Sequence, residues 1–282
     1  MKKAIFIALV LLVSCQAAPP ARMHQSMRVL RARDKRVISF GEMVRELRGS
    51  DVILLGEAHT SVADHRAQLV VIKSLAATKT PFAIGLEMFR ADDQWALDRW
   101  VSGRISLPDF VRIYYRNWSA PWPLYGDIFL YARQRRIPMV GLNLPARVAR
   151  AVFMHGLDGL TPAEKKEIPP GAGCTADKEY MSFISEVYQF HKGMGGSLRN
   201  FCRAQMVWDS AMAWHIVNRL KGAPGMKMVV LSGILHAWRR GIPEQIRRRS
   251  GYSVSVVLPE ISSRTPYSGI ENDADYVLMD VR

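Results

Sequence analysis

Short apolar runs alternate with amphipathic segments over most of this 282-residue chain. Continuous apolar runs of seven to nine residues are typical of strands buried on both faces of a parallel sheet. The runs lie at residues 51–57, 81–89, 137–143, 225–233, 252–260 and 275–281, and the last is predicted to be an edge strand. The first helix is predicted over residues 61–77, with Ser61 as its N-cap and Asp64 in a variant of the capping box. We therefore predict an α/β fold, with a mostly parallel sheet flanked by helices.

Residues from about 155 to 222 interrupt this alternation. They contain no strand-like run, include the Pro- and Gly-rich sequence "IPPGAGC", and have the pattern of two or three helices. This part is predicted to be a small all-helical lid inserted into the α/β domain, which spans residues 37–282. Before that domain, residues 16–36 are rich in Ala, Pro and Arg and are interpreted as a tether.

The first fifteen residues have the features of an export signal. Lys2 and Lys3 form a positive start, the apolar residues 4–13 are too few to span a bilayer, and the segment ends in "LVSC". This pattern predicts a bacterial lipoprotein signal whose Cys15 is lipidated; a plain secretory signal that contains a cysteine is the alternative. Gln16 stands where an aspartate would retain a lipoprotein in the inner membrane. The prediction is therefore a cell-envelope protein anchored in the outer membrane and facing the periplasm.

Export also affects how the remaining composition is interpreted. In an oxidising compartment, Cys174 and Cys202 are candidates for a disulfide, but a reduced pair is equally open. The formal net charge of +14 falls to +12 (14 − 2) when Lys2 and Lys3 leave with the signal. Nucleic acid is not an expected partner in the envelope, so anionic lipid head groups or an anionic ligand explain this charge better. A generally basic surface is the alternative, and the densest basic stretch, residues 239–249, is interpreted as a solvated helix face.

Polar side chains follow four of the predicted strands. They are Glu57, His59 and His65 after the first strand, Glu87 at the end of the second, Asn143 and Arg147 after the third, and His236 after the fourth. Ligands bind outside the carboxyl ends of parallel strands, because these ends meet at one edge of the sheet. The seven side chains are therefore predicted to form one site.

Several of these residues also have a structural explanation. His65 fits a core histidine bonded to a backbone carbonyl, and Asn143 fits a cap for the helix that follows it. Glu87 is different, because an unpaired carboxylate within "AIGLEMF" is costly to bury. Arg147 is its expected counter-charge.

The two remaining histidines and one later helix strengthen the prediction of a site. His59 and His236 fall in predicted turns, which leaves their imidazoles free to bind. The helix predicted over residues 203–220 adds Gln205 and Asp209, which are four residues apart and share an otherwise apolar face. Such a polar pair predicts a hydrogen-bonded partner beneath the helix.

Five separated motifs resemble those of one protein family. They are "GExHxxxxxH" at 56–65, "GLEMF" at 85–89, "GLNLPARVARAV" at 141–152, "FCRAQMVWDSAMAWHI" at 201–216 and "GxxHAWRRGIP" at 233–243. Over about residues 37–260, their order and spacing are similar to those of the ChaN-type haem-binding lipoproteins. That family belongs to a superfamily with the Tiki metalloproteases and the erythromycin-esterase-like proteins.

The resemblance implies an α/β body with haem bound between the lids of two molecules, its iron held by tyrosine. Tyr188 and His191 share one helical face of the predicted lid and rank first as haem-binding residues, and Tyr180 is the other tyrosine candidate. For both tyrosines, simple packing of the lid on the body is the alternative. The implied protein is a dimeric haem carrier in iron uptake, with the membrane and an outer-membrane haem receptor as partners.

The wider superfamily implies a second role for the residues at the strand ends. The catalytic or metal-binding residues would be Glu57, His59, Glu87 and His236. The supporting residues would be His65, Asn143, Arg147, Gln205 and Asp209. Carboxylates and imidazoles suit Mn, Fe or Zn with an open position for water, or acid–base chemistry. The leading hypothesis is a membrane-anchored haem-binding protein, and a divalent-metal-dependent hydrolase is the alternative.

Overall fold

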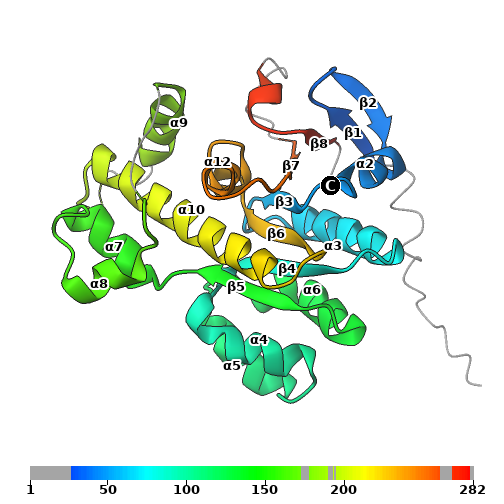
Figure 1. The fold of residues 1–282 in the computed structure, drawn as a ribbon, viewed down its shortest axis with the longest axis horizontal. Helices are drawn as coiled ribbons and strands as arrows, with labels where there is room; N and C mark the ends of the chain where they lie inside the picture. The colour runs from blue at the N-terminus through cyan, green and yellow to red at the C-terminus, as the bar shows by residue number, and fades with distance from the viewer. Residues whose placement is uncertain (1–26, 173–177, 190–192, 194, 261–268, 280–282) are drawn as a thin grey trace, which may run out of the picture.

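The computed structural model describes residues 27–172, 178–189, 193, 195–260 and 269–279. Within these residues, eight strands form one sheet that is covered by helices (Figure 1). The strands are β1 (Arg28–Arg31), β2 (Arg36–Ser39), β3 (Val52–Glu57), β4 (Phe82–Arg90), β5 (Met139–Asn143), β6 (Lys227–Gly233), β7 (Val254–Pro259) and β8 (Tyr276–Met279). Their order across the sheet is β2-β1-β8-β7-β3-β6-β4-β5.

The strands from β8 to β5 are mutually parallel, and β1 pairs antiparallel with both β2 and β8. The predicted α/β class and all six predicted strands are confirmed. Two details of the prediction are wrong. Residues 275–281 do not supply an edge strand, because β8 lies between β7 and β1. Residues 28–31 form β1 and not a tether, since Val29 and Leu30 are buried against the body.

Helices connect these strands and cover both faces of the sheet. They are α2 (Phe40–Leu47), α3 (Val62–Ala77), α4 (Gln94–Val101), α5 (Leu107–Asn117), α6 (Trp122–Arg135), α7 (Ala146–His155), α8 (Pro162–Glu167), α9 (Lys178–Tyr188), α10 (Leu198–Lys221), α11 (Ile234–Ala237) and α12 (Ile242–Arg247). Two short 3-10 helices lie at Ala91–Asp93 and Ile270–Asn272. No helix in the described residues is long and apolar enough to span a bilayer.

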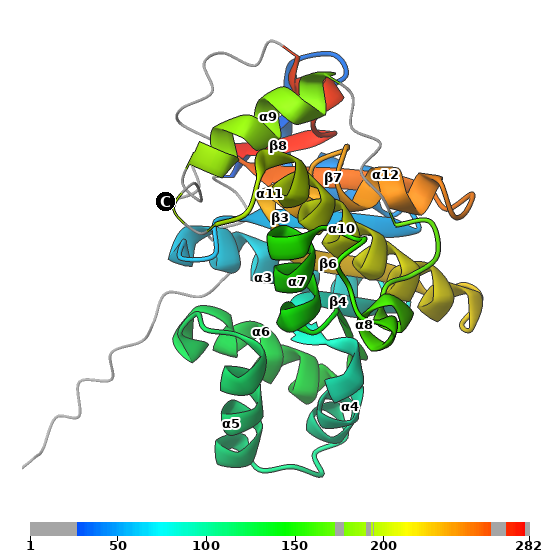
Figure 2. The ribbon, with the colours of Figure 1, turned by 90° about the vertical axis from the view of Figure 1, so that its left-hand side faces the viewer.

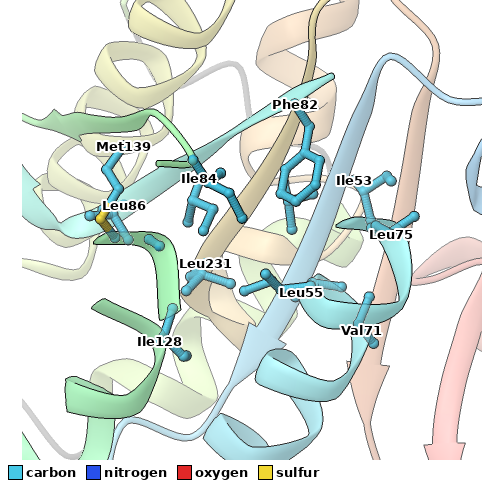
Figure 3. Close-up of a cluster of buried hydrophobic side chains, with 14 of the residues drawn as sticks. Ile53, Leu55, Val71, Leu75, Phe82, Ile84, Leu86, Ile128, Met139 and Leu231 are labelled. Carbon is cyan, nitrogen blue, oxygen red and sulfur yellow. The ribbon is translucent and has the colours of Figure 1, made fainter. Parts of the chain in front are cut away.

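Alternate residues of each central strand enter two separate cores. In β3, Ile53 and Leu55 face the core that the sheet forms with α2 to α6, part of which Figure 3 shows. Val52 and Leu54 face the other core, against α10 and α12. Strand side chains alternate between faces, and burying each Leu or Ile stabilises the fold by roughly 1.5–3 kcal/mol. The middle of the sheet is therefore packed on both faces, and the carboxyl ends of its strands provide a rigid base for a site.

The interruption after β5 is helical in its described part, as predicted. α10 is the longest of its helices and packs against α7, α9, α12 and β5 (Figure 2). Cys202 in α10 is disulfide-bonded. Cys174 and the predicted lipidation site Cys15 lie outside the described residues, so the pairing of Cys174 with Cys202 and the lipid anchor stay predictions.

Candidate functional site

Three neighbouring strands bring polar side chains to one edge of the sheet. β6 lies between β3 and β4, so the carboxyl ends of these three strands meet. Glu57 ends β3, Glu87 lies near the end of β4, and α11 begins directly after β6 and carries His236. We call Glu57, His59, Glu87, Asp209 and His236 the strand-end cluster.

Glu57 is a buried carboxylate with a partner for each oxygen. Nδ1 of His59 lies 2.9 Å from its Oε1, and the Tyr125 hydroxyl donates to the same oxygen. Nε2 of Gln68 donates to Oε2 at 2.8 Å. Burial alone would raise the pKa of Glu57, but the hydrogen bond from His59 and the nearby imidazole of His65 lower it to about 2. Glu57 is therefore ionised at neutral pH and orients His59.

Glu87 faces both histidines of the cluster. Its Oε2 accepts a hydrogen bond from the backbone N–H of Gly233 at 2.6 Å. Its Oε1 lies 3.8 Å from Nε2 of His59 and 3.8 Å from Nε2 of His236. A Cβ at position 233 would come within 2.8 Å of the His59 ring, so glycine leaves room for this arrangement. Asn143 donates from Nδ2 to the carbonyl of Glu87 at 2.8 Å and supports the strand end.

His236 has a carboxylate behind it, as His59 has. Its Nδ1 lies 2.6 Å from Oδ1 of Asp209 in α10, and both side chains are buried. Burial lowers the pKa of His236, but the charges of Glu87 and Asp209 outweigh burial and raise it to about 9. Burial raises the pKa of Asp209 to about 6, although His236 opposes that shift. Oδ2 of Asp209 has no hydrogen-bond partner among the described residues.

His59 connects the cluster with solvent. Its side chain is 39% exposed, whereas that of His236 is 10% exposed. Burial lowers the pKa of His59, but the hydrogen bond to Glu57 and the charges of Glu87 and Glu57 raise it above its ordinary value. The cluster thus contains two hydrogen-bonded His–carboxylate pairs, Glu57–His59 and Asp209–His236, and the Glu87 carboxylate lies 3.8 Å from an Nε2 atom of each pair. Histidines oriented by carboxylates in this way are suited to proton transfer.

The segment "LLGEAHTSVADH" serves as a helix start as well as a part of the cluster. The Ser61 hydroxyl accepts the N–H of Asp64 at 3.2 Å, as the capping pattern predicts. The Asp64 carboxylate reaches further back and accepts the N–H of Ala58 at 2.8 Å. These bonds hold the loop that carries His59. The predicted capping bond is therefore confirmed, and the same segment contributes Glu57 and His59 to the strand-end cluster, whose role as a site stays a prediction.

Two predicted supporting residues lie elsewhere. Arg147 is not the counter-charge of Glu87: its side chain is 60% exposed and binds Glu167 at 2.7 Å. The Glu87 carboxylate is met by Gly233 and the two histidines, so it needs no arginine. Gln205 is buried but lines a neighbouring cavity. Asp209, one turn later, is the residue of that pair that joins the cluster.

Tyr125 and Gln68 are contacts of Glu57 that the sequence did not predict. Tyr125 lies on α6 and Gln68 on α3, both within apolar helix faces. Neither follows a strand, and Tyr125 is 68 positions from Glu57. The only signal in the sequence is that the Tyr125 hydroxyl and the Gln68 amide lie on helix faces that are otherwise apolar. Polar groups buried on such faces need hydrogen-bond partners.

The predicted haem-binding residues lie on or after α9. Tyr188 packs on Phe201 with ring centroids 5.7 Å apart, and its hydroxyl donates to the carbonyl of Gly196 at 2.5 Å. Tyr180 is 3% exposed and stacks on Trp238, so it faces the body. Its phenol pKa is raised by burial. His191 lies outside the described residues and stays a prediction.

An apolar cavity of about 390 Å³ lies between α7 and α10. Its lining residues are Ala146, Ala149, Arg150, Phe153, Met154, Phe201, Ala204, Gln205 and Trp208. The lining residue Phe201 also packs against the ring of Tyr188. The ring of Trp208, another lining residue, lies edge-on to His236, with ring centroids 6.0 Å apart. The cavity therefore lies beside both the predicted haem tyrosine and the strand-end cluster.

Comparison with known proteins identifies the family. The sequence pattern described as "Haem-binding uptake, Tiki superfamily, ChaN" matches residues 43–246. The chain belongs to this family. The structure of ChaN of Campylobacter jejuni with cofacially bound haem is similar over 89% of this chain and 96% of its own, with 22% identity and a TM-score of 0.71.

More distant similarities extend over the same fold. A variant of the erythromycin esterase EreC in its open conformation is similar over 85% of this chain and 78% of its own, with 14% identity and a TM-score of 0.50. Protein RETICULATA-RELATED 5 of Arabidopsis thaliana chloroplasts is 24% identical over 226 residues. This chain spans 30% of the length of that relative. At these identities, the two solved structures show the fold that ChaN-family members share with an esterase.

The residues of this ChaN-family member fit haem better than they fit a metal ion. The cavity between α7 and α10 is walled by aromatic and aliphatic side chains, carries Arg150 and adjoins Tyr188. Among the described residues, no group of three or more His, Cys, Asp or Glu side chains is placed to hold a metal ion. The predicted Mn, Fe or Zn site therefore stays a prediction.

Proposed function

We propose that this ChaN-family protein binds haem in the cavity between α7 and α10 and acts as a haem carrier in iron uptake. The observation that carries the proposal is the apolar cavity of about 390 Å³. Phe201 lines this cavity and also packs against the ring of Tyr188. A mostly apolar pocket with a few polar groups at its rim is what a flat, hydrophobic cofactor requires. Membership of the haem-binding uptake family supports it independently.

Residues in and beside the cavity would hold the haem. Bound haem supplies an iron for ligation and two propionates. Tyr188, whose ring packs on the lining residue Phe201, would hold the iron through its phenolate, which suits ferric iron. Arg150 binds a propionate through charge-assisted hydrogen bonds. Phe153 and Phe201 would exclude water from the bound haem, and His191 is a second candidate ligand.

The protein is further proposed to act as a homodimer at the outer membrane. The cavity of about 390 Å³ is smaller than a ligand of haem size, so a second molecule of the chain is proposed to cover the rest in a homodimer. The lipid on Cys15 anchors this dimer in the outer membrane, facing the periplasm, where an outer-membrane haem receptor would be its partner.

A hemin titration of the chain lacking residues 1–15 tests the proposal. We expect a saturable Soret change that Tyr188→Phe weakens at least ten-fold, because the phenolate ligand is lost while the ring is kept. Tyr180→Phe is the matched control and leaves the titration unchanged, since Tyr180 packs on Trp238. Gel filtration with light scattering shows whether hemin doubles the mass. A titration without saturation refutes haem binding, and a spectrum unaffected by Tyr188→Phe refutes the ligand assignment.

A second candidate function is acid–base hydrolysis in the strand-end cluster. The observation that favours it is the common distance of 3.8 Å from Oε1 of Glu87 to Nε2 of both His59 and His236. His236, with its raised pKa, would donate a proton to a leaving group, and His59, oriented by Glu57, would take one from water.

Hydrolysis of a panel of activated esters would distinguish this candidate from haem binding. We expect His59→Gln and His236→Gln to abolish turnover while the hemin titration stays as in the wild type. Metal analysis of the same preparations reports whether Mn, Fe or Zn accompanies the activity. Turnover that survives both substitutions would contradict a role for the cluster.

A further inference from the structure

Helices α4 and α5 lie at one end of the molecule (Figure 2). This end carries a concave, basic surface that neither proposed function uses. It has a volume of about 600 Å³ and lies between the two helices and their connecting loop. We call it the arginine groove, after the residues Arg99, Arg104, Arg112 and Arg116 that line it. Asp109 is the acidic residue that also lines it.

Most of the charge in the arginine groove is not neutralised. Asp109 pairs with Arg112, and Arg99 lies over the ring of Trp95, 5.3 Å from its centroid. Arg104 donates to the hydroxyl of Ser102 at 2.9 Å, and Arg116 makes no ion pair within the described part of the chain. Arg104 and Arg116 are both exposed. The groove therefore presents guanidinium groups that are available to an anion.

The basic stretch at residues 239–249 is arranged differently. Arg247 and Arg248 both bind Glu244, and Arg239 binds Asp275 at 2.5 Å. Although this stretch is denser in arginine along the sequence, three of its guanidinium groups bind carboxylates, and that of Arg249 binds the oxygens of Gln245 and Pro170. The excess charge of the protein is therefore more accessible in the arginine groove than in the stretch where the sequence concentrates it.

Apolar side chains accompany the arginines. Ile105 and Ile113 line the groove. Trp95, which lines the groove, is 43% exposed, and Leu107, which follows the lining residue Ser106, is 42% exposed. A site for a small inorganic anion needs only charge, whereas an exposed Trp beside basic residues is typical of surfaces that lie at a membrane interface.

We propose that the arginine groove binds the phosphate-bearing head groups of an anionic lipid membrane. Arginine forms bidentate hydrogen bonds with phosphate, and neither Arg104 nor Arg116 is paired with a carboxylate of the described residues. Trp95 and Leu107 enter the head-group layer beside them. A net charge of +14 favours approach to such a membrane. The groove therefore fixes which end of the molecule faces the bilayer, whether or not a lipid anchor is present.

Co-sedimentation of the full chain with vesicles tests this proposal. The vesicles contain phosphatidylcholine with 0 to 40% phosphatidylglycerol, and the apparent partition coefficient is measured at each composition. Arg104→Gln/Arg116→Gln removes two unpaired guanidinium groups of the groove. Arg247→Gln/Arg248→Gln is the matched control, because it removes the same charge from the last residue and the C-cap of α12. The apolar signal segment is present in all variants and contributes equally to each.

We expect the groove variant to bind anionic vesicles about 25-fold more weakly, as each arginine at an anionic surface contributes roughly five-fold, or about 1 kcal/mol. The α12 control should lose less than three-fold, and Trp95→Ala should weaken binding at every vesicle composition. Equal losses in both double variants would mean that only net charge matters and would overturn the proposal. A changed hemin titration of the groove variant would also overturn it, because the groove would then be a haem site.

Discussion

At the scale of single residues, Asp209 controls the charge of its neighbour His236. Their atoms Oδ1 and Nδ1 are 2.6 Å apart in a buried setting. We expect Asp209→Asn to lower the pKa of His236 from about 9, because one of the two carboxylates that raise it is removed. The pKa is measured by following the His236 ring protons in an NMR titration. Asp51→Asn, which changes a carboxylate of an exposed hydrogen-bond pair, is the control.

The same titration has a consequence for stability. The pKa of His236 is raised on folding, so its contribution is complete below its ordinary pKa of 6.5 and is lost as the pH rises to about 9. Urea unfolding should show this decline in the wild type and a smaller decline in Asp209→Asn. If both proteins have the same pH dependence, the Asp209–His236 pair does not act as described.

The strand-end cluster shows which site residues can be predicted from the sequence. Glu57, Glu87 and His236 follow apolar runs, and parallel pairing brings the ends of such runs together whatever the intervening chain does. Tyr125 could not be placed, since its side chain reaches Glu57 from a helix whose rotation depends on the packing of the whole core. Arg147 was misplaced for a similar reason: α7 carries its guanidinium to Glu167 in α8.

At the scale of elements, α10 contains a histidine that makes the fold sensitive to mild acid. Burial lowers the pKa of His215 to about 4. The unfolded chain takes up a proton near pH 6.5 and the folded chain does not, so the free energy of unfolding falls between pH 6.5 and pH 4. The loss is at most about 1.4 kcal/mol per pH unit. His215→Gln should remove this part of the pH dependence in urea unfolding, while the exposed His155→Gln should leave it unchanged.

The elements themselves could be predicted where apolar runs are long. The runs that became β3 to β7 were recognisable because both faces of each strand are buried. β1 and β2 were missed, since four-residue strands among arginines have no comparable run. They form a hairpin that turns at Lys35, with a φ of 56°, and this hairpin also moves β8 from the predicted edge to the interior of the sheet.

At the scale of the whole molecule, the β1–β2 hairpin protects one side of the sheet. A chain that begins at residue 40 would leave β8 with unpaired backbone groups and would lose the buried Val29 and Leu30. We expect a lower thermal midpoint and aggregation, measured by differential scanning fluorimetry and light scattering. A chain that begins at residue 27 keeps the hairpin and is the control. Equal midpoints in the two chains would show that the hairpin does not stabilise the sheet.

The position of β3 also determines when the protein can fold. Its two neighbours, β6 and β7, come from residues 227–259, far along the chain from residues 52–57. The centre of the sheet therefore cannot assemble until almost the entire polypeptide has been synthesised, and the loops that must close are long. High contact order of this kind slows folding. A nascent chain of this protein therefore lacks both neighbours of its central strand for most of its synthesis.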